Sequence, residues 1–508
     1  MGIDVKSPSV PINASSQDVA HLLEESDAYE DPVISSTPVV QHYEGPLEES
    51  TSHHTLEASV RLPSLTMKSC NEAVKSFFES QGEKSILEQS VKSLEETLSS
   101  DQNSTLFMTI ANLLPMLQGS AVFGVPFAIL KGGLLVIPGF VLLSILADMT
   151  GSLLLDCLYE YSPKSGRRKR VRQDYAEVAE AALGPRGAQF ISVVNFIYMF
   201  ANNIVNVVLL GNCIHMLGGR RLHMSVKLTM ATFSVVMFPT MFIRRLSVLS
   251  YVSMLGVFSV IIGTLASLVV FVHHATNWSA NLHQVPIVDL ENYPLGFAIY
   301  MYSIVTHPLL PNIEGCMTNS RQMNKALHIS YSASTVLKIL FGLFGVLTYG
   351  NLTKDLVALN VADMSFSAEV IVMVTLCMYA LTTFGLMKFV ICESLDKVCV
   401  NDRFPSLAVG GRYNLLWMIP SRLFLLAICV GAAYVVPYFG LVSGVTGALI
   451  CLLLVYAFPV IFHLRLKWKE LSNCRRFNEI GLLILGVVCG LLSIYASTKA
   501  LIEKIIHS

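Results

Sequence analysis

From Leu106 to its end, the chain consists of long apolar runs separated by short polar segments. Each run is about as long as the roughly 20 helical residues that cross a ~30 Å hydrocarbon core. The pattern predicts an all-α polytopic membrane protein with about eleven transmembrane helices. They lie near residues 106–132, 134–160, 187–217, 226–243, 248–273, 292–316, 326–349, 367–391, 414–436, 438–463 and 477–500, of which 226–243 is the shortest.

The first 104 residues follow a different pattern. They are rich in Ser, Glu and Asp and hold no long apolar run, which predicts a disordered, acidic cytosolic tail over 1–104. Asp18 followed by Leu22 and Leu23 fits the acidic dileucine pattern that vesicle-sorting adaptors read, although so short a motif also occurs by chance. Apolar residues at helical spacing between Ala73 and Leu98 indicate an amphipathic helix that lies on the membrane or on the inner face of the protein.

The first apolar run is interrupted near its middle by Gly119, Gly124 and Pro126. Glycine tolerates backbone outside the helical region, and proline lacks an amide donor. Non-helical backbone persists within a membrane only where it is buried in protein or lines a cavity. We therefore predict a broken helix whose second half begins near Gly124 and presents an N-terminus suited to a carboxylate. A glycine-rich helix that packs tightly on its neighbours is the alternative.

The sixth run is interrupted in the same way. Pro308 and Pro311 each remove an amide donor, and His307 and Glu314 are polar in an apolar context. Interrupted segments at matching places in two halves indicate an inverted repeat around a central substrate site, as in secondary transporters. We predict a first five-helix repeat over 105–274, a second over 275–463, and an eleventh helix with a short tail over 464–508.

The composition narrows the class of protein. Of 508 residues, 53% are hydrophobic and only 14% are charged, which excludes a soluble domain of this length. The net charge of −1 supports no nucleic-acid partner. The 11 cysteines form no CxxC pair and no cluster with histidine at metal-ligand spacing, so we expect neither a metal nor a cofactor.

The distribution of basic residues predicts the orientation. With the N-terminus in the cytosol, the inner loops hold nineteen Lys and Arg and the outer loops five. The run Arg167–Arg172 is then a topology signal, with a lipid-headgroup contact as the alternative. The glycosylation sequons at Asn277 and Asn351 fall in outer loops, although Asn13 and Asn103 match the same pattern on the inner side.

A series of short motifs follows in order along these runs. The motifs are Gln118-Gly119, Phe123 to Leu130 with Gly132-Gly133, Cys157 to Glu160, Arg170 to Arg172, Gly211-Asn212, Leu310-Pro311, Glu314-Gly315, Val436-Pro437, Gly444 to Gly447 and Phe462 to Leu466. Together they resemble the amino acid/auxin permease superfamily, over residues 110–480. They look most like its branch of vesicular inhibitory amino acid transporters, which carry GABA and glycine.

This resemblance implies a leucine-transporter-like fold, with a 5+5 inverted repeat plus one helix, and proton-linked amino acid transport across a vesicle or vacuole membrane. The chain departs from the family pattern in places. Thr306-His307 stands where the family carries a Ser-Gln pair, Phe384 to Met387 replaces a Tyr-Pro-Leu-Pro stretch, and Tyr198 stands where Glu is expected. In this fold these positions line or flank the transport route, so the departures bear on the substrate and the coupling ion and not on the fold.

The predicted substrate site combines the two breaks with the third and eighth spans. We expect the amides around the first break to meet a carboxylate, while the other groups face the rest of the substrate; small polar residues that only join helices are the alternative. The predicted substrate-binding residues are Gln118, Gly119, Ser120, Gly124, Asn203, Asn206, Thr306, His307 and Thr383.

Two residues are candidates for carrying the coupling proton. His307 lies beside Pro308 near the bilayer centre, and a free imidazole titrates near pH ~6.5, between an acidic lumen and a neutral cytosol. A neutral hydrogen-bonding role in substrate selection is the alternative. Asp148 lies in the middle of the second span, where an ionisable group is costly, and a buried hydrogen-bonded acid is the alternative there. Asp156 and Lys388 lie closer to the inner face, which favours a solvated or capped Asp156 and a snorkelling Lys388, with a functional role as the alternative.

We therefore interpret the chain as a secondary active transporter of a vesicle, vacuole or lysosome membrane. Its partners would be a small neutral amino acid such as GABA or glycine, the coupling ion H⁺, membrane lipids and a sorting adaptor. A membrane sensor that binds amino acids with little net flux is the alternative. A membrane enzyme is disfavoured, because no nucleophile–base pair or metal cluster stands out among the spans.

Overall fold

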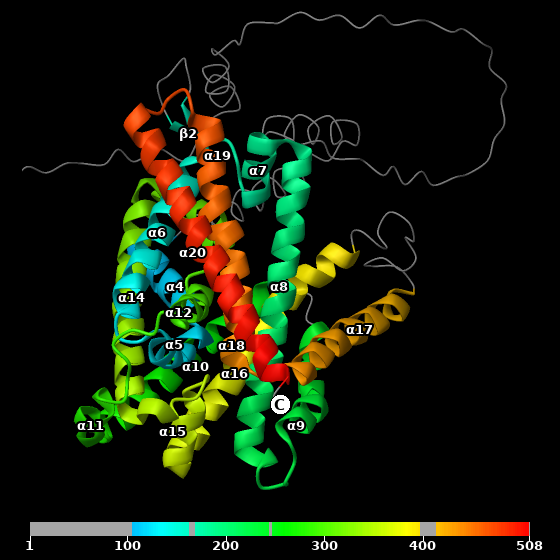
Figure 1. Ribbon diagram of the computed structural model, residues 1–508. Helices are drawn as coiled ribbons and strands as arrows, with labels where there is room; N and C mark the ends of the chain where they lie inside the picture. The colour runs from blue at the N-terminus through cyan, green and yellow to red at the C-terminus, as the bar shows by residue number, and fades with distance from the viewer. Residues whose placement is uncertain (1–103, 162–167, 243–245, 397–412, 507–508) are drawn as a thin grey trace, which may run out of the picture. The chain divides into compact units, whose positions relative to one another are not determined.

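The computed structural model describes residues 104–161, 168–242, 246–396 and 413–506, almost all of them helical (Figure 1). The sorting motif of Asp18, Leu22 and Leu23 and the helix expected between Ala73 and Leu98 lie outside the described residues. Short 3₁₀ or π turns are denoted η. The elements up to residue 282 are α4 (Leu106–Gln118), η1 (Ser120–Gly124), α5 (Val125–Gly132), α6 (Val136–Asp156), β1 (Tyr159–Tyr161), β2 (Arg168–Arg170), α7 (Tyr175–Leu183), α8 (Pro185–Ile214), η2 (His215–Gly219), α9 (Val226–Phe233), η3 (Ser234–Met237), η4 (Pro239–Phe242), α10 (Leu246–His273), η5 (Ala275–Asn277) and α11 (Trp278–Leu282).

The second half of the chain continues the same helical pattern. Its elements are α12 (Tyr293–Tyr302), η6 (His307–Leu309), α13 (Leu310–Gly315), η7 (Ser320–Gln322), α14 (Met323–Tyr349), η8 (Gly350–Leu352), α15 (Ala358–Met364), α16 (Phe366–Asp396), α17 (Asn414–Val435), α18 (Phe439–Ile450), η10 (Cys451–Ala457), α19 (Phe458–Lys467) and α20 (Asn473–Ile506).

Nine helical segments among the described residues are long and apolar enough to cross a membrane. They correspond to nine of the eleven predicted spans, and the all-α polytopic class is confirmed. The two other predicted spans are built from shorter pieces. One is the broken sixth span. The other is 226–243, which is divided into α9, η3 and η4, with Pro239 at the start of the last turn.

The second predicted span ends earlier than expected. We predicted a helix to residue 160, but α6 ends at Asp156, and Tyr159–Tyr161 forms an antiparallel pair with Arg168–Arg170. The pairing places Glu160 opposite Lys169, and opposite charges at facing positions stabilise such a pair. The prediction missed this hairpin because the apolar run continues past the last helical turn.

Both predicted helix breaks are present. In the first span, α4 and α5 are separated by Gly119 and the turn η1, and in the sixth, α12 and α13 are separated by four non-helical residues and η6. The positions of the two breaks agree with the glycines and prolines from which they were predicted. An unwound stretch inside each of two apolar spans requires protein around it, since lipid offers its backbone no hydrogen bonds.

The broken helices are surrounded by long ones. The helix α14 packs along α4 and α5, α12 packs on α18, and α16 lies between α8 and α10. In Figure 1, α4, α6, α12 and α14 lie side by side. The stacked rings of Phe140 and Tyr300, with centroids 4.2 Å apart, join α6 to α12. The breaks therefore lie at the centre of the bundle.

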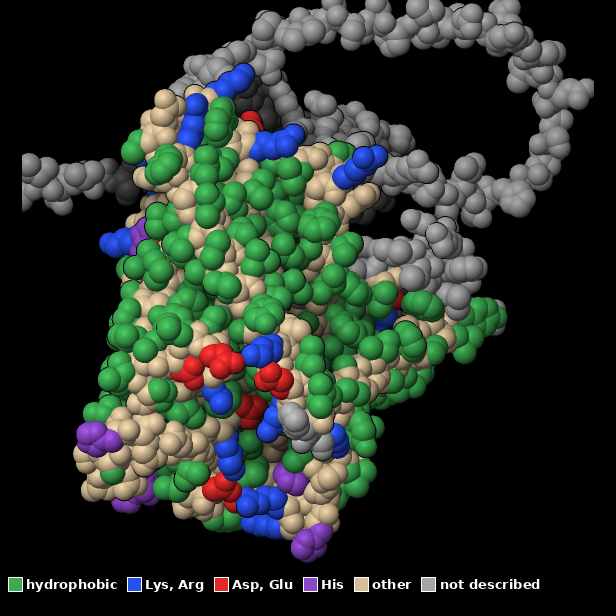
Figure 2. Space-filling view, in the orientation of Figure 1, with side chains coloured by type: hydrophobic (Ala, Val, Ile, Leu, Met, Phe, Trp, Pro, Cys, Tyr) green, Lys and Arg blue, Asp and Glu red, His purple; other side chains and the backbone are tan. Residues whose placement is uncertain are grey.

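The two ends of the bundle differ in charge. Figure 2 shows a broad apolar belt between basic side chains at the end that holds β2 and mixed charges at the end that holds α15. We refer to these ends as the hairpin face and the α15 face. An apolar belt bounded by charged ends is the pattern of a bilayer-spanning protein.

Candidate functional site: a cavity between two helix breaks

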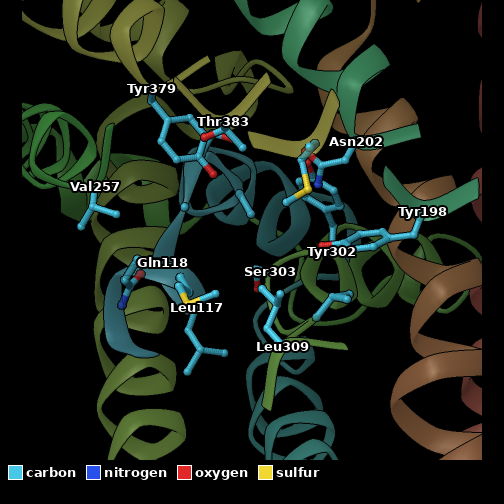
Figure 3. A pocket seen from close by; sticks show the side chains of 16 residues that line it. Leu117, Gln118, Tyr198, Asn202, Val257, Tyr302, Ser303, Leu309, Tyr379 and Thr383 are labelled. Carbon is cyan, nitrogen blue, oxygen red and sulfur yellow. The ribbon is translucent and has the colours of Figure 1, made fainter. Parts of the chain in front are cut away.

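A small cavity lies between the two breaks and has a volume of about 120 Å³. One water needs roughly 10–15 Å³ by the same measure, so the cavity has room for a small solute. Its walls come from α4, η1, α8, α10, the sixth break and α16 (Figure 3). The lining residues are Met116, Leu117, Gln118, Gly119, Ser120, Ala121, Tyr198, Asn202, Val257, Tyr302, Ser303, Val305, Leu309, Tyr379, Thr383 and Met387.

At the first break, the backbone turns sharply at Gly119. Its φ of +46° lies in the left-handed region that L side chains rarely adopt. A Cβ at this position would lie 3.0 Å from the Tyr379 hydroxyl, so the aromatic side chain of α16 approaches the bare backbone. The same hydroxyl lies beside Ser120 and Thr383. Glycine is therefore required here for both the turn and the close approach.

On α8, three polar residues repeat at helical spacing. The Asn206 amide donates to Asn202 Oδ1 over 3.0 Å and to the Asn202 carbonyl over 3.1 Å. Asn202 in turn interacts with the hydroxyl of Tyr198, one turn earlier. Asn206 thus fixes the orientation of Asn202, and Asn202 and Tyr198 line the cavity (Figure 3).

At the sixth break, α12 ends at the cavity with Tyr302 and Ser303. The Ser303 hydroxyl turns back and donates to the Tyr300 carbonyl over 2.6 Å. The Tyr331 hydroxyl of α14 donates to the Ile304 carbonyl over 3.0 Å. Side chains thereby satisfy carbonyls that a continuous helix would have paired itself, which holds the unwound backbone in place.

None of the sixteen residues lining this cavity carries a formal charge. Hydroxyl, amide and aromatic groups form its polar surface, and the C-terminal ends of α4 and α12 direct partial negative charge towards it. Three tyrosine rings add faces that attract cations. The arrangement can accommodate a solute with a cationic group and several hydrogen-bonding positions.

Four of the predicted substrate residues line the cavity: Gln118, Gly119, Ser120 and Thr383. Gly124 does not, because its Cα faces Ile299 of α12, where an added Cβ would lie 3.2 Å from a methyl group.

Asn203, Asn206 and Thr306 lie behind the lining. Asn203 is fully buried with no hydrogen-bond partner for its amide among the described residues. Asn206 orients Asn202 through its side-chain amide. The Thr306 hydroxyl pairs with the Tyr331 hydroxyl at 2.8 Å and supports the sixth break from outside the cavity.

The two proton-carrier candidates also lie outside the lining. His307 is fully buried against α6, with Nε2 3.1 Å from the Thr150 hydroxyl. The Asp148 carboxyl oxygen Oδ2 lies 2.5 Å from Nδ1 of His328 on α14. The roles predicted for these two residues therefore remain predictions, but their partners are now defined.

The predicted set of substrate-binding residues did not include five residues that line the cavity, namely Tyr198, Asn202, Tyr302, Ser303 and Tyr379. One signal was available, because Tyr198, Asn202 and Asn206 recur every four residues along one face of α8. Tyr379 and Thr383 have the same spacing on α16. No local pattern identified Tyr302 and Ser303, whose role depends on where α12 ends.

The short segment that precedes α15 in the sequence covers the first helix break on the side nearest the α15 face. The Val357 amide donates to the Phe123 carbonyl of η1 over 2.9 Å. Asp355 accepts the Gly440 amide at the start of α18 through Oδ2, over 3.0 Å, and the Leu356 amide through Oδ1, over 3.1 Å. Burial raises the pKa of the Asp355 carboxyl above its ordinary value, while these hydrogen bonds and the nearby Lys504 oppose the rise.

Beyond this segment lies a second cavity, of about 640 Å³, at the α15 face. Its charged lining residues are Lys131, Lys354, Asp355, Glu503 and Lys504. Asp355 and Val357 therefore belong to a partition that separates a charged cavity from the uncharged central one. We call residues 353–357 the partition segment.

The hairpin face is held by ion pairs. Arg170 donates to the Pro311 carbonyl over 2.8 Å and pairs with Glu314 at 3.3 Å, which joins β2 to α13. The buried His463 of α19 contacts Glu479 of α20 at 2.9 Å and Asp156 of α6 at 3.3 Å. The basic run read as a topology signal thus also has a structural role, and Asp156 is paired.

A bundle of membrane-spanning helices with two broken helices around a small cavity defines a membrane transporter. The chain belongs to the family of transmembrane amino acid transporter proteins, whose family model matches residues 102–503. The predicted family is thereby confirmed, and the alternative of a membrane enzyme is excluded.

The chain is similar to several curated transporters. It is 27% identical to the vesicular inhibitory amino acid transporter of Xenopus laevis over 77% of this chain and 76% of that protein. It is 26% identical to the vesicular GABA transporter of Caenorhabditis elegans, over 78% and 79%, and 26% identical to the amino acid transporter AVT1I of Arabidopsis thaliana, over 79% and 96%. Among solved structures, the inward-facing conformation of Mhp1 matches with a TM-score of 0.41 and 12% identity, over 78% of this chain and 90% of that chain.

Proposed function

We propose that the protein is a secondary active transporter that carries a small neutral amino acid across a vesicle or vacuole membrane in exchange for protons. The observation that carries this proposal is the small uncharged cavity between the two broken helices. Interrupted helices around a central site are the feature by which secondary transporters bind substrate and coupling ion.

The chemistry of the cavity suits a zwitterion. The substrate carboxylate would lie against Gly119 and Ser120, where η1 begins, and its ammonium group near the ends of α4 and α12. Tyr198 and Tyr302 would offer ring faces to the ammonium. The relatives named for vesicles, for inhibitory amino acids and for GABA support a small neutral substrate and a vesicle membrane.

The distribution of charge supports a cytosolic N-terminus. The basic side chains of the hairpin face, among them Arg168 and Arg170, favour the cytosolic side. The N-terminal tail would then be cytosolic, and the α15 face, with Asn351 and the charged cavity, would face the lumen. His307 and Asp148 are the candidates for proton coupling that the sequence predicts, and both lie outside the lining of the central cavity.

Uptake by proteoliposomes tests the function. The purified full-length protein is reconstituted, and a panel of labelled amino acids is offered with and without a pH gradient that is acidic inside. We expect accumulation of a small neutral amino acid that the gradient increases. Saturable binding of an amino acid without accumulation would refute transport and favour the sensor.

A further inference from the structure

Lys338 of α14 is buried at the sixth break, and its side chain is only 1% exposed. Its Nζ donates to the Ser303 carbonyl over 2.6 Å and lies 5.6 Å from the centre of the Tyr300 ring. Among the residues that the structure describes, no carboxylate forms an ion pair with it. A buried ammonium normally requires an anionic partner, so its position needs an explanation.

The ammonium lies at the C-terminal end of a half-helix. Three carbonyls at and just after the end of α12 accept hydrogen bonds from other elements: Met301 from the Cys451 thiol at 3.1 Å, Ser303 from Lys338, and Ile304 from Tyr331. Lys338 is the charged donor among these three. The partial negative charge at a helix C-terminus stabilises a cation at this point.

The first broken helix reaches the same turn of α14. Gln118, the last residue of α4, donates from its side chain to the Ser334 carbonyl over 3.4 Å, one turn before Lys338. The C-terminal ends of α4 and α12 therefore both lie against the turn Ser334–Lys338. In secondary transporters, such half-helix ends and unwound carbonyls hold the coupling cation.

We propose that Lys338 is the proton-carrying residue of the transport cycle. Its ammonium occupies the cation position at the ends of α4 and α12 while the central cavity is empty, and it loses one proton when the ammonium group of a substrate reaches the same two helix ends. This inference rests on the proposed function and names the group that couples it to protons.

The two helix ends hold either the Lys338 ammonium or the substrate ammonium but not both, and this competition leads to exchange of substrate for protons. On the cytosolic side, the arriving zwitterion displaces one proton from Nζ to water, and Lys338 becomes a neutral amine that can still donate a hydrogen bond to the Ser303 carbonyl. After the substrate leaves on the lumenal side, the amine takes one proton from the acidic lumen. One amino acid therefore moves from the cytosol into the lumen for each proton that moves from the lumen to the cytosol. The reason is that the substrate ammonium and the Lys338 ammonium compete for one site.

The titratable groups on the elements around Lys338 are neutral, paired with another residue or located at the other cavity. Tyr300 of α12 and the Cys451 thiol of η10 are neutral neighbours, as is Tyr331 two turns earlier on α14. Asp148 of α6 is paired with His328, and α4 carries no titratable side chain. The charged residue of α5, Lys131, lines the cavity at the α15 face.

Two substitutions at Lys338 separate proton carriage from a structural role. Lys338→Gln is never charged, and Lys338→Arg keeps its charge and cannot release the proton. In proteoliposomes, we expect Lys338→Gln to retain exchange of labelled for unlabelled substrate and to lose the accumulation driven by a pH gradient. We expect Lys338→Arg to lose both. Gradient-driven accumulation that persists in Lys338→Gln, or that Lys338→Arg restores, would overturn the assignment.

The matched control is Lys325→Gln, since Lys325 is an exposed lysine on the same helix, α14, and its replacement removes the same charge. We expect this variant to keep gradient-driven accumulation. If His307→Gln loses it and Lys338→Gln keeps it, the proton travels through His307 and the inference about Lys338 is wrong.

A second measurement needs no substrate. In full-length protein carrying Leu309→Cys, a cysteine that lines the central cavity, we expect the rate of maleimide labelling to vary with pH. Each rate is normalised to the same cysteine in denatured protein at that pH. Adding Lys338→Gln should abolish the variation, and a variation that persists would refute the inference. If the variation behaves as expected and no amino acid accumulates, the proposed function fails while Lys338 stands as the titrating group.

Discussion

The partition segment offers the most direct test of how the central cavity is closed on the α15 side. Asp355 joins this segment to the start of α18 through the Gly440 amide, at 3.0 Å. Asp355→Ala would remove this charged acceptor and leave the amide buried without a partner. A hydrogen bond to a charged group contributes about 1.5–3 kcal/mol, so closure should weaken by roughly 2 kcal/mol. At about 1.4 kcal/mol per tenfold change, this is an increase of roughly 30-fold in the open population.

The assay uses Val357→Cys, because Val357 is fully buried in the partition segment and bonds to η1 through its backbone. A membrane-impermeant maleimide then reports opening, and variants without this cysteine give the background labelling. We expect Asp355→Ala to increase the labelling rate about 30-fold, in line with the loss of about 2 kcal/mol. Asp355→Asn keeps an acceptor oxygen for Gly440 and should change the rate much less.

The pH dependence of closure follows from the raised pKa of Asp355. Burial raises the pKa in the closed state, and exposure on opening returns it towards about 3.9. The closed state therefore binds more protons, so acid favours closure, and this contribution is lost as the pH rises through the raised value. Both Asp355 variants should abolish this dependence.

The control is Asp363→Asn, which changes an exposed acid on α15 that pairs with Lys354 at 2.6 Å and Arg220 at 2.8 Å. Exposed ion pairs contribute about 0–1 kcal/mol, so labelling should increase less than about fivefold. The reasoning is refuted if Asp355→Ala leaves the labelling rate unchanged, or if Asp355→Asn and Asp355→Ala accelerate labelling equally.

Three further outcomes are expected. Gly119→Leu should abolish uptake in proteoliposomes with expression largely retained, since a side chain at φ +46° is strained and meets Tyr379; uptake at the wild-type rate would show that the first break does not approach substrate. Replacing Leu22 and Leu23 by Ala should shift the protein from internal vesicles to the cell surface in fluorescence microscopy, and an unchanged distribution would mean a chance match. Glycan mapping should find Asn351 on the lumenal side, and a cytosolic Asn351 would reverse the proposed orientation.

The sequence predicted the helix breaks because their causes are local. Gly119 and Pro308 act on their own backbone, and the apolar run around each of them indicates a segment that lies in a membrane. The run 226–243 shows the limit of this reasoning. Its apolar length predicted a complete span, whereas the chain forms one short helix and two turns around Pro239.

The partners of the buried polar groups could not be predicted, because they depend on which helices face each other. His307 was placed at the substrate by its position beside a break, but its ring turns to Thr150 on α6. Lys338 lies within an apolar stretch of α14 and was not singled out. Its role depends on the carbonyl of Ser303 at the end of α12, whose position the sequence does not reveal. The polar spacing on α8 was visible in the sequence, although it did not reveal which of the three asparagines lines the cavity.

The placement of charge around the central cavity determines which substrates it can hold. None of the described residues that line the cavity is charged, while Lys338 and Asp355 lie just behind its two breaks. Helix ends carry about half an elementary charge each and can match both groups of a zwitterion without a fixed net charge. An amino acid with a charged side chain would bring a further charge into this cavity without a partner, at a cost of several kcal/mol. Neutral amino acids should therefore compete with one another for uptake, and Lys, Arg, Asp and Glu should compete poorly; inhibition by these four equal to that by a neutral amino acid would contradict this account of selectivity.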